Sequence, residues 1–238
     1  MMLSMQVRFP AIALTLALLA VSGLSAFTFQ PITQDYAPAG EGASHVFRVA
    51  NTTDSQIAVR VSVRPRRIEP DGTEVQGDPS EDFVVYPGRL LLDPGDSRSV
   101  RVVWTGGTPE QELAYRIIAE QLPVAANTDQ PDQGGTIVLT YRYEGSIYVV
   151  PPGARPEIGI AAVEPIRRGE TEVLRITVEN TGTRHTLLSQ PRLELRTSAA
   201  GEPVLTLNPD DLVGLAGENM LATSVRHFTV PLPEDLPQ

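Results

Sequence analysis

The chain has 238 residues, a formal net charge of -10 at pH 7, 21 Pro, 19 Gly and no Cys. This acidic balance argues against a nucleic-acid binder, which would show a basic stripe. Without cysteine the protein has neither disulfides nor thiolate chemistry. The density of Pro and Gly disfavours long helices, because Pro removes a backbone donor and Gly has a high entropic cost in a helix.

The first residues have the pattern of a secretory signal. Met1–Arg8 carries one positive charge, Ala11–Val21 is an uncharged run of apolar and small residues, and further small residues follow. That order is typical of a signal peptide, and the run is shorter than the ~20 residues that a membrane span needs. We therefore expect residues 1–26 to be removed by cleavage after Ser25 or Ala26. The exported chain would then have no stable membrane insertion; the alternative is an uncleaved N-terminal anchor.

Beyond the signal, short segments of alternating polar and apolar residues follow one another. They occupy residues 45–49, 57–63, 83–86, 99–104 and 113–122. Clusters of Asn, Asp, Pro and Gly separate them, as at Asp93–Asp96. Many short strands with turn residues between them are typical of an antiparallel sandwich of the immunoglobulin type.

The pattern changes after residue 123. Residues 124–135 are polar and end in two Gly, which predicts a flexible loop. Residues 136–150 form the longest strand-like run, and the Pro-rich segment 151–156 predicts a hinge. Alternation then resumes at 172–179, 192–196 and 227–230. We therefore predict an all-β protein with two immunoglobulin-like β-sandwich domains joined by a hinge, at residues 27–152 and 153–238.

Catalytic constellations are scarce. His45, His185 and His227 are far apart and have no metal-ligand spacing. No Gly-rich phosphate loop and no nucleophile elbow occur, and many carboxylates fall in turns. The sequence therefore predicts neither an enzyme nor a cofactor, and an enzyme is left as an alternative without support.

Four stretches in the first predicted domain occur in a distinctive order. They are Phe47–Thr52, Val85–Gly95, Ser97–Trp104 and Tyr115–Pro123. This ordered set, followed by a long loop, a long strand and a Pro-rich hinge, resembles the first domain of PapD-like periplasmic pilus-assembly chaperones. The resemblance covers most of residues 27–152. Beyond the hinge only the general shape matches, and the ending Phe228–Pro233 resembles the archaic branch of the family.

The resemblance implies a boomerang-shaped chaperone of the periplasm. Such a protein lends the last strand of its first domain to pilin subunits that lack a strand, and delivers them to an outer-membrane usher. The donor strand would be Thr136–Glu144, whose apolar face carries Ile137, Leu139, Tyr141 and Tyr143. The alternative is an ordinary half-buried strand whose apolar face belongs to the protein's own core. Charged replacements at Leu139 and Tyr141 distinguish the two.

The resemblance also implies a cleft in which two cations hold the C-terminal carboxylate of the subunit. The matching positions here are Gln34 and Ser146, so both cations are absent in this alignment. Since charge-assisted hydrogen bonds are roughly twice as strong as neutral ones, we expect a weaker anchor or a substitute from Arg142 or Arg116. A slipped register is the alternative. Glu120 matches an acidic residue that joins the two domains, or else it is a solvated surface charge.

Two other functions fit a secreted β-sandwich. One is an adhesin or binding module, and the other is a structural envelope protein without a client. An adhesin should concentrate aromatic residues in its loops, whereas here Tyr141, Tyr143 and Tyr148 lie in the long strand and the loop 124–135 has none. This distribution favours the chaperone, with pilin or fimbrial subunits and an usher as its partners.

Overall fold

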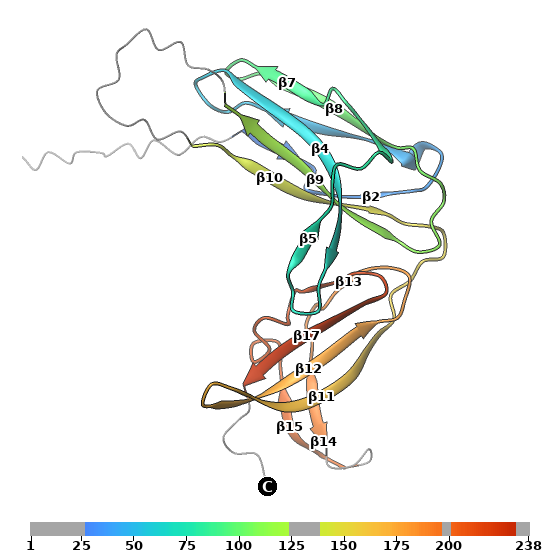
Figure 1. The fold of residues 1–238 in the computed structure, drawn as a ribbon, viewed down its shortest axis with the longest axis vertical. Helices are drawn as coiled ribbons and strands as arrows, with labels where there is room; N and C mark the ends of the chain where they lie inside the picture. The colour runs from blue at the N-terminus through green and yellow to red at the C-terminus, as the bar shows by residue number, and fades with distance from the viewer. Residues whose placement is uncertain (1–26, 124–138, 197–200, 232–238) are drawn as a thin grey trace, which may run out of the picture.

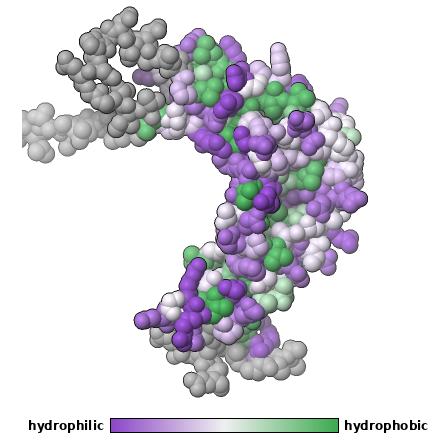
Figure 2. All heavy atoms as spheres, viewed as in Figure 1, coloured by the Kyte–Doolittle hydropathy of each residue, from purple (hydrophilic) through white to green (hydrophobic). Residues whose placement is uncertain are grey.

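The computed structural model describes residues 27–123, 139–196 and 201–231. Within these ranges the chain forms strands β1 to β17, one 3-10 turn at Glu41–Ala43 and no α-helix. Figure 1 shows two bodies, with β1 to β10 in one and β11 to β17 in the other, joined along one side. The molecule is therefore bent, and Figure 2 shows its concave outline. The predicted all-β, two-sandwich fold is confirmed.

The first domain is built from two sheets. One has the order β1-β3-β8-β6, with bounds Thr28–Gln30, Ser44–Ala50, Ser97–Trp104 and Phe83–Tyr86. The other has the order β2-β10-β9-β4-β5, with bounds Thr33–Tyr36, Arg142–Val149, Leu113–Leu122, Ile57–Ile68 and Glu74–Gln76. A further strand, β7 (Arg89–Leu92), also pairs with β4.

The core of this domain lies between the two sheets. Side chains alternate along a strand, so Val59, Val61 and Val63 of β4 are buried on one face. Phe83 lies edge-on to Tyr115 at a ring-centroid distance of 5.0 Å. Each fully buried apolar side chain stabilises the fold by about 1.5–3 kcal/mol, so no disulfide is needed.

The chain changes sheets between β1 and β2, and this positions the candidate site. At the crossing, the Ile32 carbonyl accepts a hydrogen bond of 2.8 Å from the Ser146 backbone N–H. The approach is close, because a Cβ at Gly145 would lie only 2.7 Å from the Ile32 carbonyl oxygen. From there β2 runs parallel to Ser146–Val149 of β10. Among the residues whose positions are described, only the second half of β10 is therefore paired on this side.

The second domain is smaller. Its main sheet has the order β11-β12-β17, with bounds Ile158–Arg168, Thr171–Asn180 and Ser224–Pro231. Two short antiparallel pairs pack against it: β13 (Thr186–Leu187) with β16 (Asn219–Met220), and β14 (Leu193–Arg196) with β15 (Pro203–Leu207). Its buried apolar cluster is separate from that of the first domain. The boundary at 152/153 stays a prediction that agrees with this separation.

Strands with clear alternation of polar and apolar residues were predicted from the sequence. The strands that were missed, or whose bounds differ from the prediction, have physical causes. The long run from Thr136 is shorter than expected, since β10 begins at Arg142. Strand β11 was missed because, as an edge strand, it is largely exposed along its length and shows no clean alternation. Strands β1, β2 and β5 have three or four residues, too few to show a period.

Candidate functional site

The first candidate surface is the free edge of β10 and the residues just before it. Leu139 is 61% exposed, whereas Tyr141 and Tyr143 are partly buried against the first domain's core. The Tyr143 ring lies edge-on to Phe27 at a centroid distance of 4.8 Å. Ile137 lies outside the described residues. The expected apolar face is therefore divided, because the tyrosines contact the protein's own core and Leu139 is free.

A shallow groove runs beside this edge. It is lined by Phe29, Gln30, Pro31, Ile32 and Tyr143. On the other side β10 is fully paired with β9, and the Gln121 backbone N–H donates to the Tyr141 carbonyl at 2.8 Å. A chain arriving at the free edge would therefore meet main-chain groups that no described residue pairs with, next to an apolar groove.

A row of charges crosses the outer face of the sheet at the start of β10. Glu120 of β9 forms ion pairs with Arg60 of β4 and, at 3.5 Å, with Arg142 of β10. Arg142 also binds Glu144 at 2.7 Å. Glu120 thus pairs with basic residues as expected, but both belong to the first domain. In the described part of the chain no ion pair joins it to the second domain, which differs from its predicted interdomain role.

Arg116 lies further along the same face, among groups that hold it in place. Its guanidinium binds the Glu74 carboxylate at 2.6 and 2.8 Å and donates to the Ser146 hydroxyl at 2.9 Å. Arg66 binds the same carboxylate at 3.1 Å. Two arginines therefore share one carboxylate, which leaves this cluster one net positive charge.

The charges in this cluster control the acidity of Glu74. Burial by itself raises the pKa of Glu74, but hydrogen bonds from Arg116 and Gln76 and the charges of Arg116 and Arg66 outweigh it and lower the pKa to about 2. The carboxylate is therefore ionised at neutral pH.

The structure brings together only part of the predicted anchor. Arg116 and Ser146 are in contact, but Gln34 is opposite Ile147 in the β2–β10 register, and Thr33 is opposite Ser146. Paired residues of neighbouring strands point to the same face, so Gln34 and Ser146 lie on opposite faces. Gln34 therefore does not join the Arg116–Ser146 contact, and Thr33 takes the place beside Ser146. Arg142, at the start of β10, reaches this cluster only through Gln76, which accepts a hydrogen bond of 3.4 Å from Arg142 and donates one of 3.0 Å to Glu74.

The joint between the domains uses residues that the sequence did not single out. The Glu112 side chain is 1% exposed and binds the His185 ring Nδ1 at 2.7 Å. The His185 ring stacks on Tyr148 of β10 at a centroid distance of 3.7 Å. The Tyr148 hydroxyl contacts Arg66 at 2.6 Å and Asn219 at 2.7 Å. The end of β10 is thereby tied to both domains.

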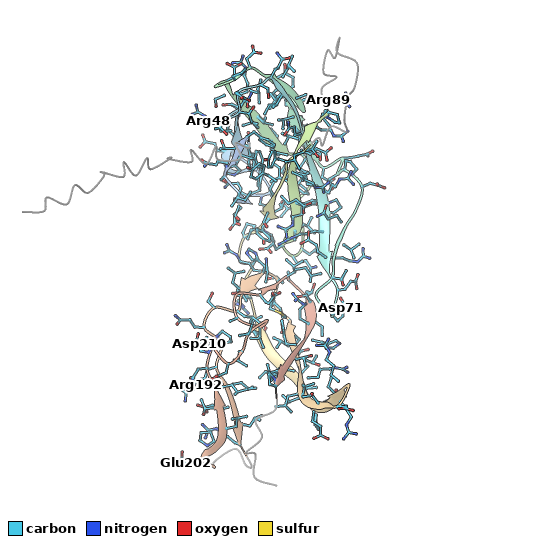
Figure 3. The ribbon with its side chains drawn as sticks, turned by 90° about the vertical axis from the view of Figure 1, so that its left-hand side faces the viewer. Arg48, Asp71, Arg89, Arg192, Glu202 and Asp210 are labelled. Atoms are coloured by element: carbon cyan, nitrogen blue, oxygen red, sulfur yellow. The ribbon has the colours of Figure 1, made fainter. Side chains whose placement is uncertain are left out.

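A hairpin adds a second joint. β4 and β5 extend from the first domain toward the second, as Figure 1 shows. At its tip, marked by Asp71 in Figure 3, the Pro70 carbonyl accepts a hydrogen bond of 2.7 Å from the His227 backbone N–H of β17. Glu112 and His185 are 73 positions apart, and Pro70 and His227 are also distant in the sequence. No local sequence motif could therefore predict either contact between the domains.

The comparison with protein families agrees with this geometry. Residues 38–155 match the family described as pili and flagellar-assembly chaperone, PapD N-terminal domain. The first domain belongs to the PapD-like chaperones. The matched region contains the free edge of β10, the Arg116 cluster and Glu112.

Solved structures of PapD-like chaperones have the same two-domain fold. A chain from the CsuC–CsuE chaperone–tip adhesion subunit complex of the archaic Csu pili of Acinetobacter baumannii is 15% identical, with a TM-score of 0.60 over 89% of this chain and 90% of that one. A chain from the Salmonella enterica SafA pilin–SafB chaperone complex is 18% identical, with a TM-score of 0.55 over 87% and 85%. The E. coli chaperone DraB is 21% identical, with a TM-score of 0.52 over 88% and 86%.

At these identities the similarity establishes the fold. No curated protein sequence matches the chain. Among the residues with described positions, none belongs to a helix long and apolar enough to cross a bilayer.

Proposed function

We propose that the protein is a periplasmic chaperone that captures pilin-type subunits by strand addition at the free edge of β10. The observation that carries the proposal is the half-paired strand, because β2 covers β10 only from Ser146 onward. Exposed sheet edges are normally protected, since they pair readily with other chains. Here Leu139, three residues before the strand, is instead apolar and 61% exposed.

Strand addition supplies both affinity and selectivity. The main-chain groups of residues 139–145 that point away from β9 would bond to the subunit, while alternate side chains enter its groove. Leu139, together with Ile137 outside the described residues, would fill the place of the missing strand. Tyr141 and Tyr143 would instead hold the donor edge against the chaperone's own core. No nucleotide or cofactor is required for this exchange.

The test compares Leu139→Glu with Leu91→Glu. Both leucines are similarly exposed, at 61% and 59%, but Leu91 lies on β7, away from the free edge. In periplasmic pull-downs with the tagged full-length protein, we expect Leu139→Glu to lose the pilin-type subunit and Leu91→Glu to retain it. Both variants should keep the wild-type circular dichroism spectrum. If the wild type recovers neither a subunit nor an usher, an adhesin or a structural envelope protein becomes the better account.

We also propose that the Arg116 cluster binds the C-terminal carboxylate of the subunit. Its net positive charge and its contact with Ser146 support this assignment. The Arg116→Ala variant should weaken subunit capture. Arg142→Ala should have a smaller effect, because Arg142 pairs with the two carboxylates of Glu120 and Glu144, whereas Arg116 and Arg66 share only that of Glu74. Equal retention of the subunit by both variants would rule out this anchor.

For delivery to the usher, we propose the outer face of the β1-β3-β8-β6 sheet. These four strands contain no Asp or Glu, although the chain carries 29 of them. Val46, Val84 and Tyr86 are exposed on them, and in the register Arg101 lies beside both Val46 and Tyr86. An apolar, basic face suits a partner with acidic and apolar residues. We expect Arg101→Glu to lose usher binding while subunit capture persists.

Export to the periplasm follows from the predicted signal peptide. Cleavage after Ser25 or Ala26 leaves Phe27 in the mature chain, and Phe27 is fully buried against Tyr143. The intact mass of the periplasmic protein should therefore correspond to a chain that begins at Ala26 or Phe27. A mature chain that still begins at Met1 would contradict this. The resemblance of Phe228–Pro233 supports assignment to the archaic branch.

A further inference from the structure

The second domain has an open sheet edge of its own. β11 is the outer strand of the β11-β12-β17 sheet, and within the described residues no strand pairs with its other side. Three of its large apolar side chains are well exposed: Ile158 at 41%, Ile160 at 56% and Val163 at 38%. Exposed edges are templates for pairing, and clustered apolar exposure marks interaction sites.

The two halves of β11 differ in how they are protected. The second half carries Glu164, Pro165, Arg167 and Arg168, residue types that block pairing between edges. The first half, residues 158–163, has the sequence Ile-Gly-Ile-Ala-Ala-Val and no charge. It also contains no Pro, and its one protective feature is the register shift between Ile160 and Ala162. Residues 158–160, which precede this shift, are the unprotected part of β11.

A groove opens directly beside residues 158–160. It has a volume of about 230 Å³, and Ile158 and Ile160 form part of its wall. Other wall residues, among them Ile176, Leu193 and Leu212, belong to the buried core of the second domain. Arg192 is the one charged residue in the lining, and it pairs with Glu194 at 2.8 Å. The sandwich is therefore open to an apolar occupant on this side.

We propose that this edge binds the same edge of a second copy of the chain, in an antiparallel, two-fold symmetric pair. With the axis at Ile160, the two Ile160 residues lie opposite each other, and the regular run of residues 158–160 contains no charged residue. A two-fold interface must be complementary to itself, and an uncharged segment meets that condition. Because the whole chain carries a net charge of -10, an uncharged patch is where two copies can approach with least repulsion.

The segment that follows β17 is a poorer occupant because of where it leaves the sheet. Pro231 lies opposite Val173, whereas Ile160 and Ile158 lie opposite Val178 and Asn180, at the other end of β12. Five to seven residues of strand separate these points, about 17–23 Å. β17 also lies on the other side of β12 from β11, so a segment that leaves Pro231 starts far from the groove.

The interface is small, because the register between β11 and β12 shifts between Ile160 and Ala162 and shortens the regular run. Small interfaces give weak, reversible association. The first test is sedimentation equilibrium of the mature full-length protein from micromolar to submillimolar concentration. We expect a monomer–dimer equilibrium, and a monomer at every concentration would refute the proposal.

Substitutions then locate the interface. Ile160→Glu places two carboxylates face to face at the axis, and we expect it to weaken dimerisation by about 100-fold. Val213→Glu is the control, because Val213 is 81% exposed in the same domain but lies outside β11. Leu139→Glu is the second control, because it changes the subunit-binding edge. If Leu139→Glu dissociates the dimer and Ile160→Glu does not, the interface is the β10 edge and the proposal is wrong.

The absence of cysteine allows a direct geometric test. Residues opposite each other in antiparallel neighbouring strands have a Cα separation that a disulfide can bridge. Under mild oxidation, Ile160→Cys should give a covalent dimer, whereas Val213→Cys should stay monomeric. A variant that ends at Pro231 should dimerise like the full chain. If it dimerises while the full chain does not, the C-terminal residues occupy the groove instead.

Discussion

At the scale of single residues, two arginines on the outer face of the β10 sheet, Arg116 and Arg66, depend on the carboxylate of Glu74. Glu74 binds Arg116 with both oxygens and Arg66 with one of them. Arg66 is almost fully buried, with a side chain only 2% exposed. A buried guanidinium without a partner is costly, so Glu74 stabilises the fold and holds Arg116 next to Ser146.

This arrangement predicts a pH-dependent loss of stability. Hydrogen bonds and nearby charges lower the pKa of Glu74 to about 2 against the opposing effect of burial, so its stabilisation is complete above the unfolded-state pKa and is lost as the pH falls. We expect Glu74→Gln to cost about 1–2 kcal/mol at pH 7, after allowance for partial exposure. Wild type and variant should converge between about pH 5 and pH 2.

Urea unfolding at a series of pH values measures this effect. Glu69→Gln is the matched control, because Glu69 pairs with Arg67 at the surface, where both side chains are well exposed. Its change in unfolding free energy should be below about 1 kcal/mol. A constant difference between wild type and Glu74→Gln from pH 7 to pH 2 would contradict the assignment.

At the scale of the element, β10 has two different halves. Its second half is held by β2 and by Tyr148, whose hydroxyl contacts Arg66 and Asn219. Its first half lacks a partner on one side in the described residues, although Tyr143 packs on Phe27. The closed half fixes the strand in space, and the open half is left for a partner.

Gly145 stands at the transition between these halves. A Cβ there would lie 2.7 Å from the Ile32 carbonyl oxygen and 2.8 Å from Ile117 Cγ2. We therefore expect Gly145→Ala to push the Ile32 crossing away from β10 and to cost about 1–3 kcal/mol of unfolding free energy. Hydrogen exchange of the Thr33–Tyr36 backbone should become faster. Gly107→Ala is the control, since a Cβ at Gly107 would meet nothing within 4 Å, and its stability should not fall.

At the scale of the whole molecule, the two domains are held by a few buried polar contacts. Glu112 accepts hydrogen bonds from the backbone N–H and the ring of His185, and its own N–H donates to the Thr183 carbonyl at 2.9 Å. Arg184 adds an ion pair of 2.8 Å with Asp35 of β2. The domains meet close to the end of β10, so their relative angle and the position of the donor strand are coupled.

We expect Glu112→Ala to loosen the angle between the domains without unfolding either one. Loss of the carboxylate leaves the buried partners of Glu112 unpaired, at a cost of about 1–3 kcal/mol. Small-angle scattering should show a broader distribution of intramolecular distances. Glu120→Ala is the matched control, because Glu120 pairs with Arg60 and Arg142 inside the first domain, and its scattering should be unchanged. If Glu120→Ala changes the scattering and Glu112→Ala does not, the interdomain role first expected of Glu120 is correct.

The sequence by itself determined the features that depend only on residues close together in the chain. Alternation and turn residues identified strands β3, β4, β6, β8 and β9, and four ordered stretches identified the family of the first domain. Side-chain direction has a period of two along a strand, so a single chain reveals it without any knowledge of its neighbours. Leu139 could be singled out on that basis.

The tertiary structure decided whatever depends on which strands become neighbours. The strand crossing at Ile32 leaves half of β10 open, and the β2–β10 register places Thr33 rather than Gln34 beside Ser146. Glu112 takes the interdomain position expected of Glu120 because its backbone lies against Thr183 and His185. Such contacts join residues far apart in the chain, and a one-residue change of register reverses which face a side chain takes.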